Sequence, residues 1–270
     1  MNININRTAL NICSACNLRC KHCLAFIPYY KKPKIMQYSE ARAILEQYFA
    51  VVDSVKHFTV TGGEPLLNKD TLSILEEVIR YKSQIECSVD FVTNATIAIP
   101  DEILGFFESN KDCSRIVLSD YGPKLSKELE AIKQKLDARG ITYRVSKFHG
   151  DNLYYNGWID FSDHSLKWHT VEERDKNAAG CIHNVGKYFV INDGEIHRCS
   201  RSFWRIKNGY IPKIKGEYVP LMDDSISLEE KKNYLRMMCE STSSTSCAHC
   251  VGLRNDAKRV EPAQQLEQVI

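Results

Sequence analysis

Features that would indicate a membrane or nucleic acid as a partner are missing from this chain of 270 residues. Its 36 Lys and Arg residues nearly balance its 34 Asp and Glu residues, and the net charge is only +2. A field of one sign, which would attract nucleic acid or an anionic membrane, is therefore not expected. No apolar run approaches the roughly 18 residues of a membrane span. We expect neither nucleic acid nor a membrane as a partner.

The chain also lacks internal repeats, low-complexity segments and the marks of a secretory signal. Residues 1–11 contain no basic segment followed by an apolar core and a small-residue cleavage site, so the expected location is the cytoplasm. Hydrophobic residues make up 43% and charged residues 26%, as in ordinary globular proteins. The length suffices for one large domain with a small appendage.

Cysteine, in contrast, is abundant, with 11 residues. A reducing cytoplasm argues against a disulfide framework, so metal binding is the better explanation. Cys87 and Cys113 lie in or beside predicted strands, and we interpret them as buried, unreactive thiols. Seven other cysteines form two groups with ligand-like spacing: Cys16, Cys20 and Cys23, and then Cys181, Cys199, Cys247 and Cys250.

The first group has the spacing C-x3-C-x2-C. It is one thiolate short of the four that complete an ordinary iron–sulfur cluster or a structural zinc site. A metal centre with an open position can bind and react with a molecule that is not protein. The incomplete set therefore indicates a reactive site.

Strands and helices are predicted to alternate about five times over residues 7–145. This alternation is typical of a parallel sheet with helices packed outside it, and an open or partial barrel fits best. Polar turns follow four of the strands and should crowd one mouth of the barrel. These turns are the cysteine loop, Gly62-Gly63-Glu64, Thr93-Asn94 and Ser119-Asp120.

The predicted fold class is α/β, a partial (β/α)6 TIM-like barrel followed by a small cysteine-rich domain. We divide the chain into a barrel core at 1–150, a connecting or lid segment at 151–180, the cysteine-rich domain at 181–252 and a tail at 253–270. The third part contains one hairpin signal, in which Asp193-Gly194 lies between two short apolar runs.

C-x3-C-x2-C at the end of the first predicted strand and Gly62-Gly63-Glu64-Pro65 at the end of the second form a specific combination. In this respect the chain resembles the radical SAM (S-adenosylmethionine) superfamily, and in particular its SPASM/twitch branch. The resemblance implies that the first three cysteines hold a 4Fe-4S cluster whose open iron binds SAM, and that His22 lies beside the adenine. Residues 62–65 would receive the methionine amino group of SAM, with the glycines allowing a close backbone approach. Asn94 and Ser119 would also contact SAM.

The second group resembles the twitch domain, which binds one auxiliary 4Fe-4S cluster. Four thiolates complete this cluster and leave no open iron for substrate, which favours electron transfer. The alternative is a zinc site with four cysteine ligands, because C-x2-C with two distant cysteines also suits tetrahedral zinc. For the first group, the alternative is a zinc site or a set of redox cysteines.

The resemblance implies an enzyme that reductively cleaves SAM and abstracts hydrogen from a C–H bond. Our first hypothesis is an oxidoreductase that dehydrogenates a secondary alcohol of a carbohydrate or aminocyclitol, with flavodoxin or ferredoxin as electron donor. The alternatives are an epimerase of a sugar or peptide residue with a thiol hydrogen donor, a peptide-maturing enzyme, and a zinc-binding scaffold. The catalytic candidates are Asp120, Arg144 and Cys239, and further candidates for substrate contact are Tyr121, His149, Tyr155, Trp158 and Arg201.

Overall fold

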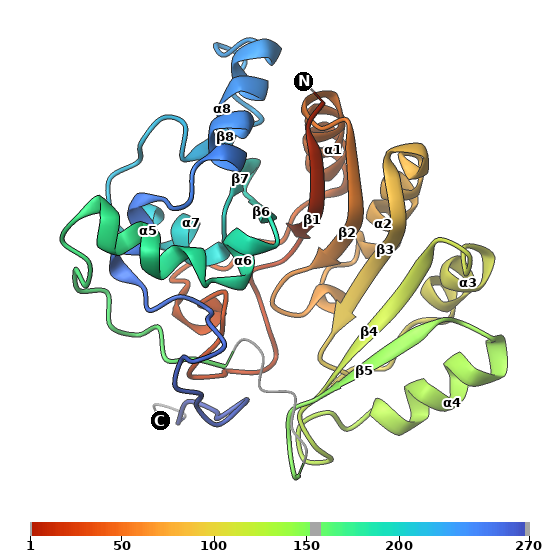
Figure 1. The fold of residues 1–270 in the computed structure, drawn as a ribbon. Coiled ribbons are helices and arrows are strands. Elements are labelled where there is room, and N and C mark those ends of the chain that lie inside the picture. Colours follow the sequence, from red (N-terminus) through yellow and green to blue (C-terminus); the bar gives the residue numbers. More distant parts are fainter. Residues whose placement is uncertain (1, 152–157, 268–270) are drawn as a thin grey trace.

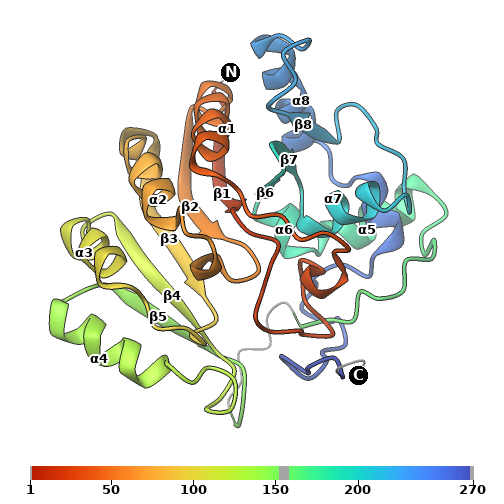
Figure 2. The same ribbon diagram turned by 180° about the vertical axis from the view of Figure 1, so that it is seen from behind.

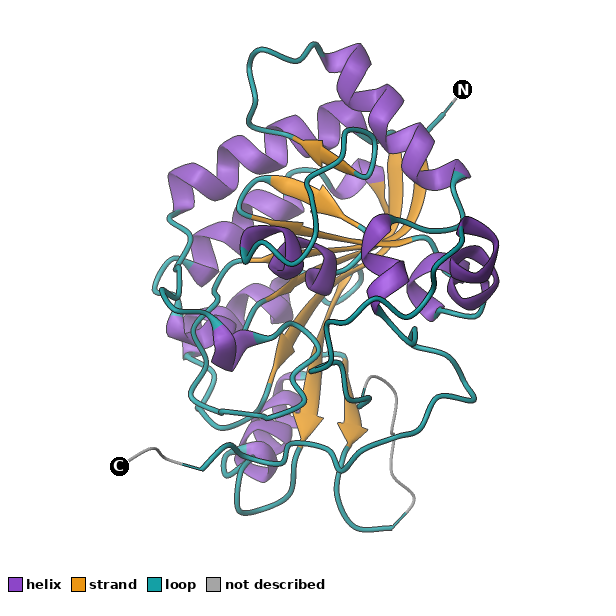
Figure 3. Ribbon diagram, turned by 90° about the vertical axis from the view of Figure 1, so that its left-hand side faces the viewer, coloured by secondary structure: helices purple, strands orange, loops and turns teal. Residues whose placement is uncertain are grey.

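The computed structural model describes residues 2–151 and 158–267 (Figure 1). Within these residues one eight-stranded sheet has the strand order β5-β4-β3-β2-β1-β6-β7-β8. The strands are β1 (Asn4–Asn11), β2 (Ser54–Thr61), β3 (Ile85–Thr93), β4 (Ser114–Asp120), β5 (Tyr143–Lys147), β6 (Tyr188–Asn192), β7 (Glu195–His197) and β8 (Tyr218–Pro220). Figure 3 shows them fanning out side by side.

Four helices connect the first five strands, and they lie together on one side of the sheet (Figures 1 and 2). They are α1 (Tyr38–Val51), α2 (Thr71–Ile79), α3 (Asp101–Ser109) and α4 (Leu129–Arg139). Strands β1 to β5 pair in parallel, as their alternation with helices predicts. Helix α4 ends at Gly140, where φ is +62°, a conformation that glycine adopts without strain.

The two faces of the parallel sheet have different roles. Thr8 and Leu10 of β1 are fully buried, and the Tyr48 hydroxyl of α1 donates to Thr8 Oγ1 at 2.7 Å. Ile44 of α1 belongs to the same hydrophobic core. Ala9, between Thr8 and Leu10, lines a cavity on the opposite face, because successive side chains of a strand point to opposite sides. Helices therefore cover one face and leave the other for a site.

An ionic cluster joins three strands on the cavity face. Asp90 of β3 is fully buried and accepts hydrogen bonds from Arg7 Nη1 of β1 at 2.9 Å and from Arg115 Nε and Nη2 of β4 at 2.7 and 3.0 Å. Burial alone would raise the pKa of Asp90, but hydrogen bonds from Arg115 and Ser88 and the arginine charges hold this pKa below its ordinary value. The cluster ties β1, β3 and β4 together.

The sixth parallel strand corrects the predicted barrel. Strand β6 pairs in parallel with β1, from Arg7 opposite Tyr188 to Leu10 opposite Ile191, and not with β5. The strand and helix alternation therefore supplies five strands, and the predicted hairpin supplies the sixth. Strands β5 and β8 are the free edges, so the sheet is open.

The hairpin forms where the sequence predicts it. Asp193 and Gly194 connect β6 to β7 with φ values of +48° and +78°, as a two-residue turn requires. The second strand ends at His197, two residues before Cys199. The remaining helices are α5 (Val171–Ala179), α6 (Ile182–Val185), α7 (Ser200–Lys207) and α8 (Leu228–Glu240). No helix in the described residues is long and apolar enough to cross a membrane.

Candidate active site

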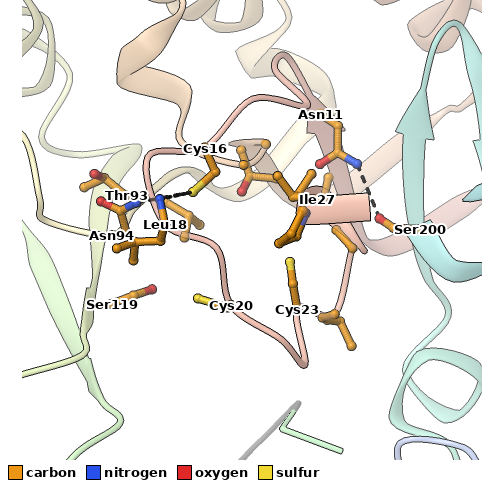
Figure 4. Close-up of a pocket in the computed structure, with 18 of the residues that line it drawn as sticks. Asn11, Cys16, Leu18, Cys20, Cys23, Ile27, Thr93, Asn94, Ser119 and Ser200 are labelled. Atoms are coloured by element: carbon orange, nitrogen blue, oxygen red, sulfur yellow. Dashed lines mark hydrogen bonds between the residues drawn. The ribbon is translucent and has the colours of Figure 1, made fainter. Parts of the chain in front are cut away.

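A cavity of about 350 Å³ lies at the carboxyl ends of the parallel strands, as predicted for the barrel mouth. Figure 4 shows the three cysteines of the first group between Asn94 and Ser119 on one side and Asn11 and Ser200 on the other. The lining also includes an aromatic group, Tyr121, Phe148 and Trp158, and residues of the cysteine-rich region, among them His183 and Arg201.

Cys16, Cys20 and Cys23 all line this cavity. N–H groups point at two of the sulfur atoms: Leu18 N and Asn94 Nδ2 donate to Cys16 Sγ at 3.4 and 3.6 Å, and Gln265 Nε2 donates to Cys20 Sγ at 3.3 Å. Burial, with a smaller contribution from neighbouring cysteines, raises the pKa of Cys16 and of Cys20 to about 12. Thiolates at these positions therefore need a cationic partner, and the irons of a cluster supply one.

Neither group of cysteines is arranged around a single metal ion in the described residues. Over residues 2–151 and 158–267, no set of three or more Cys, His, Asp or Glu side chains is arranged to hold a single metal ion. The fit to an iron–sulfur cluster thus depends on the shared cavity and on the N–H donors directed at sulfur, a feature that sets the properties of such clusters.

The structure shows a reason for Gly62 and Gly63 beside the predicted one. Both line the cavity, but their closest neighbours are backbone atoms of the cysteine loop. A Cβ on Gly62 would lie 2.4 Å from Cys13 O, and a Cβ on Gly63 would lie 2.2 Å from Ala15 O. Gly63 N donates to Cys13 O at 2.6 Å, and Glu64 N donates to Ala15 O at 2.9 Å. The glycine pair is needed because the cysteine loop packs directly on it.

Glu64 and Pro65 do not line the cavity. The fully buried Glu64 carboxylate accepts hydrogen bonds from Thr93 Oγ1 at 2.9 Å, Asn94 N at 2.8 Å and Leu66 N at 3.1 Å. Burial raises its pKa despite these three donors. The side chain therefore joins the ends of β2 and β3, and its oxygens are already occupied by protein groups.

Of the other three predicted SAM contacts, two line the cavity and one does not. Asn94 and Ser119 line the cavity, and Asn94 also donates to Asn17 Oδ1 at 2.9 Å. His22 is not among the lining residues, and its Nδ1 lies 3.5 Å from Asp160 Oδ1.

None of the three catalytic candidates lines the cavity in the described residues. The Asp120 carboxylate accepts from Gly122 N at 2.9 Å and lies 3.0 Å from His149 Nε2. Arg144 is exposed on β5. Cys239 lies on α8 and packs against the main hydrophobic core. Their catalytic roles stay predictions without a place at this cavity.

Among the substrate-contact candidates, Tyr121, Trp158 and Arg201 line the cavity, and Tyr155 lies outside the described residues. Tyr121 and Phe148 stack with ring centroids 5.3 Å apart, and the Trp158 ring lies edge-on to both. Sequence reasoning missed Asn11, His183 and Ser200. The sequence features that could have identified them are the predicted strand end, where Asn11 lies, and the positions of His183 and Ser200 close to Cys181 and Cys199.

The second group of cysteines lines a smaller cavity beside α6 and α7. Cys181, Cys199, Cys247 and Cys250 all contribute to its wall. Leu253 N donates to Cys181 Sγ at 3.4 Å, Gly252 N to Cys250 Sγ at 3.3 Å and Ser244 N to Cys247 Sγ at 3.5 Å. Three arginines also line this cavity, Arg198, Arg201 and Arg205. Backbone donors and positive charge both suit an anionic group held by these thiolates.

Among the cysteines outside the two groups, Cys87 is exposed, which corrects the prediction that it is buried.

Arg201 and His183 line both cavities and so form a shared wall. Arg201 is 2% exposed, its guanidinium lies 4.2 Å from the centroid of the Phe161 ring, and its Nε and Nη1 have no hydrogen-bond partner in the described residues. Burial would lower the pKa of Arg201, but Cys199, Cys250 and Cys181 raise it. Burial lowers the pKa of His183 to about 3, so its ring is neutral at physiological pH.

Comparison with known proteins identifies the class of this site. The model of the radical SAM superfamily matches residues 10–145, which is half of the chain. The chain therefore belongs to the radical SAM superfamily, whose members carry a 4Fe-4S cluster and bind SAM.

Particular relatives match only in part. The GTP 3',8-cyclase of Campylobacter jejuni is 32% identical over 85 residues, covering 32% of this chain and 27% of the relative. The GTP 3',8-cyclase of Pasteurella multocida is 38% identical over 71 residues, covering 26% and 20%. The chain thus matches about a quarter of the length of these curated relatives.

Two solved structures share the fold over most of the chain. BtrN in complex with AdoMet and 2-DOIA aligns with a TM-score of 0.54 and 14% identity, covering 89% of each chain. Native anSMEcpe with bound AdoMet aligns with a TM-score of 0.52 and 14% identity, covering 84% of this chain and 81% of that one. At this level of identity the similarity is one of fold.

Proposed function

We propose that this chain is a radical SAM oxidoreductase of the SPASM/twitch branch that dehydrogenates a secondary alcohol of a carbohydrate or aminocyclitol. Cys181, Cys199, Cys247 and Cys250 would hold an auxiliary 4Fe-4S cluster, and the cysteine-rich part of the chain would be a twitch domain. The observation that carries this proposal is the wall of Arg201 and His183 between the two cysteine-lined cavities.

The reaction requires an electron acceptor close to the substrate. Oxidation of an alcohol to a ketone removes two hydrogens, and radical SAM chemistry supplies a carbon radical that takes one of them as a hydrogen atom. The other hydrogen leaves the hydroxyl as a proton, and one electron remains to be removed. A cluster completed by four thiolates has no open iron and suits this role. A shared wall keeps the path from substrate to acceptor short.

The chain's own residues suit a small, hydroxyl-rich substrate. Asn11 donates to Asn192 Oδ1 and, at 3.3 Å, to Ser200 Oγ. Asn11, Ser200 and Arg201 thus form a polar side of the cavity, while the aromatic group that includes Tyr121 and Trp158 excludes water from it. The cavity volume lies in the range of small-molecule sites. In the similar fold of BtrN, AdoMet and a second ligand, 2-DOIA, are bound together.

The geometry favours dehydrogenation over epimerisation. An epimerase of this type would need a thiol at the substrate that is free to donate hydrogen. The thiols that line the cavity in the described residues are those of Cys16, Cys20 and Cys23, which we assign to the cluster, and Cys239 packs against the main core.

Anaerobic reconstitution with iron and sulfide tests the auxiliary cluster. We expect about eight irons per chain in the wild type and about four in a Cys247→Ala/Cys250→Ala double variant. Zinc at these cysteines in place of iron would refute the electron-acceptor role. A Cys87→Ala variant, which removes an exposed thiol, is the matched control and should keep all the iron.

The reaction itself is tested by supplying reductant, SAM and panels of cyclitols, sugars and GTP. The proposal expects 5'-deoxyadenosine together with a product that has lost two hydrogens, made from a cyclitol or sugar. Deuterium uptake from heavy water without net oxidation would instead identify an epimerase. Turnover of GTP alone would identify a cyclase like the named relatives.

A further inference from the structure

The end of the described chain crosses the cysteine loop. Cys20 and Gln265 form an antiparallel β-bridge. Lys21 N donates to Gln264 O at 2.7 Å, and Leu266 N donates to Arg19 O at 2.8 Å. In Figures 1 and 2 the blue end of the chain lies next to the red cysteine loop. We call residues 263–266 the C-terminal strap.

The Gln265 side chain completes this contact. Its Oε1 accepts from Arg19 N at 2.7 Å, and its Nε2 donates to Cys20 Sγ at 3.3 Å and to Ala263 O at 2.6 Å. The orientation of the amide is determined by its partners, because the Arg19 N–H can only donate and the Ala263 carbonyl can only accept. The amide nitrogen must therefore face the sulfur.

Apolar contacts hold the strap in place. Ala263 is buried and packs with Cys20 and Trp158. Val260 N donates to Trp158 O at 2.9 Å, just before the strap begins. As a result Cys20 is only 8% exposed, although it lies on a loop.

We propose that the C-terminal strap is part of the SAM-cluster site and that Gln265 is a positioning residue for Cys20. It holds the Cys20 sulfur toward the cavity and, through its N–H···S bond, stabilises negative charge on that sulfur. Hydrogen bonds to cluster sulfurs are one of the means by which a protein sets the reduction potential. Gln265 should therefore make the SAM cluster easier to reduce. This inference depends on membership of the radical SAM superfamily and not on the proposed substrate or auxiliary cluster.

Three variants of the full chain separate the contribution of the N–H···S bond from that of the other contacts of the strap. Gln265→Leu removes all three side-chain hydrogen bonds, to the Cys20 sulfur, to Arg19 N and to Ala263 O. Gln265→Glu keeps an acceptor for Arg19 N but places a carboxylate oxygen against the sulfur. Gln264→Leu is the matched control, because Gln264 is exposed and binds the loop through its backbone carbonyl alone.

The measurements are iron content after anaerobic reconstitution, the rate of iron release to a chelator, and a redox titration of the cluster whose electron paramagnetic resonance signal changes on addition of SAM. For Gln265→Leu we expect faster iron release and an equilibrium shifted about tenfold toward the oxidised cluster, which corresponds to about 59 mV for one electron. Gln265→Glu should shift in the same direction, and Gln264→Leu should match the wild type.

Two outcomes would overturn the proposal. One is a Gln265→Leu protein with the potential and iron-release rate of the control. The other is a Gln265→Glu protein with wild-type potential, since the N–H···S bond is then irrelevant. If Gln265→Leu fails to bind iron, Gln265→Glu still decides the question, because its strap keeps the contact with Arg19.

Discussion

Replacement of Gly63 by Ala tests whether the glycine pair serves the cysteine loop. The added Cβ would lie 2.2 Å from Ala15 O and 2.9 Å from Cys16 Cβ, whereas ordinary contacts begin at 3.4 Å. The backbone at Gly63 is not in the left-handed region, so the conflict is purely steric. The loop must therefore retreat by about 1 Å, and the Cys16 thiol moves with it.

The size of the effect follows from these contacts. The retreat weakens the hydrogen bonds from Gly63 N to Cys13 O and from Glu64 N to Ala15 O, each worth about 0.5–1.5 kcal/mol. We expect a loss of about 1–3 kcal/mol in the free energy of unfolding. The loss of activity should be greater, because a displacement of about 1 Å near reacting groups lowers a rate about 100-fold.

The assay compares Gly63→Ala with Gly105→Ala. Gly105 lies inside α3, where an added Cβ meets no atom within 4 Å, so its replacement should stabilise the protein by about 0.5–1 kcal/mol. Urea denaturation, iron content and the rate of 5'-deoxyadenosine formation are measured for both variants. If Gly63→Ala binds iron and cleaves SAM as fast as Gly105→Ala does, the steric reasoning is refuted.

Three further predictions concern buried groups. Asp90→Asn should lower the free energy of unfolding by about 1–3 kcal/mol at neutral pH, a moderate value because the two arginine partners are 26% and 28% exposed. Because the folded-state pKa of Asp90 is lowered, its contribution is present above the ordinary carboxyl pKa and is lost as pH falls through the folded pKa. The difference between wild type and variant in urea denaturation should therefore shrink below about pH 4. A constant difference would contradict the ionic role. Asp112→Asn, at an exposed position, is the control. Glu64→Gln should lower the free energy of unfolding by about 1–3 kcal/mol, since either orientation of the amide sets its NH2 group against a backbone donor, and unchanged urea denaturation would refute this. Cys13→Ala should keep the cluster iron that Cys16→Ala loses, because Cys13 is buried in the main core; equal iron loss in both would assign Cys13 to the cluster site.

Features that depend on neighbours in the chain were predicted correctly. The alternation of strands and helices over residues 7–145 and the Asp193-Gly194 turn both appear where local rules place them. The position of the cavity was also predicted, because the polar ends of parallel strands must meet at one edge of a sheet.

The roles of individual side chains were harder to predict. Glu64 was expected at the ligand, yet its carboxylate is buried and bonded to Thr93 and Asn94. Asp120, Arg144 and Cys239 were the catalytic candidates, but the structure does not bring them to the cavity. A motif specifies which residue type stands at a position, whereas the direction of a side chain depends on partners far along the chain.

The sequence by itself determined the class of chemistry, because C-x3-C-x2-C and Gly62-Gly63 are local patterns whose spacing follows from backbone and ligand geometry. Only the tertiary structure decided what surrounds these patterns. It placed β6 beside β1, brought Arg201 and His183 between two cavities, and laid Gln265 on Cys20, 245 positions away in the chain. Such contacts arise from the packing of distant segments against a shared sheet, and no local rule of sequence encodes them.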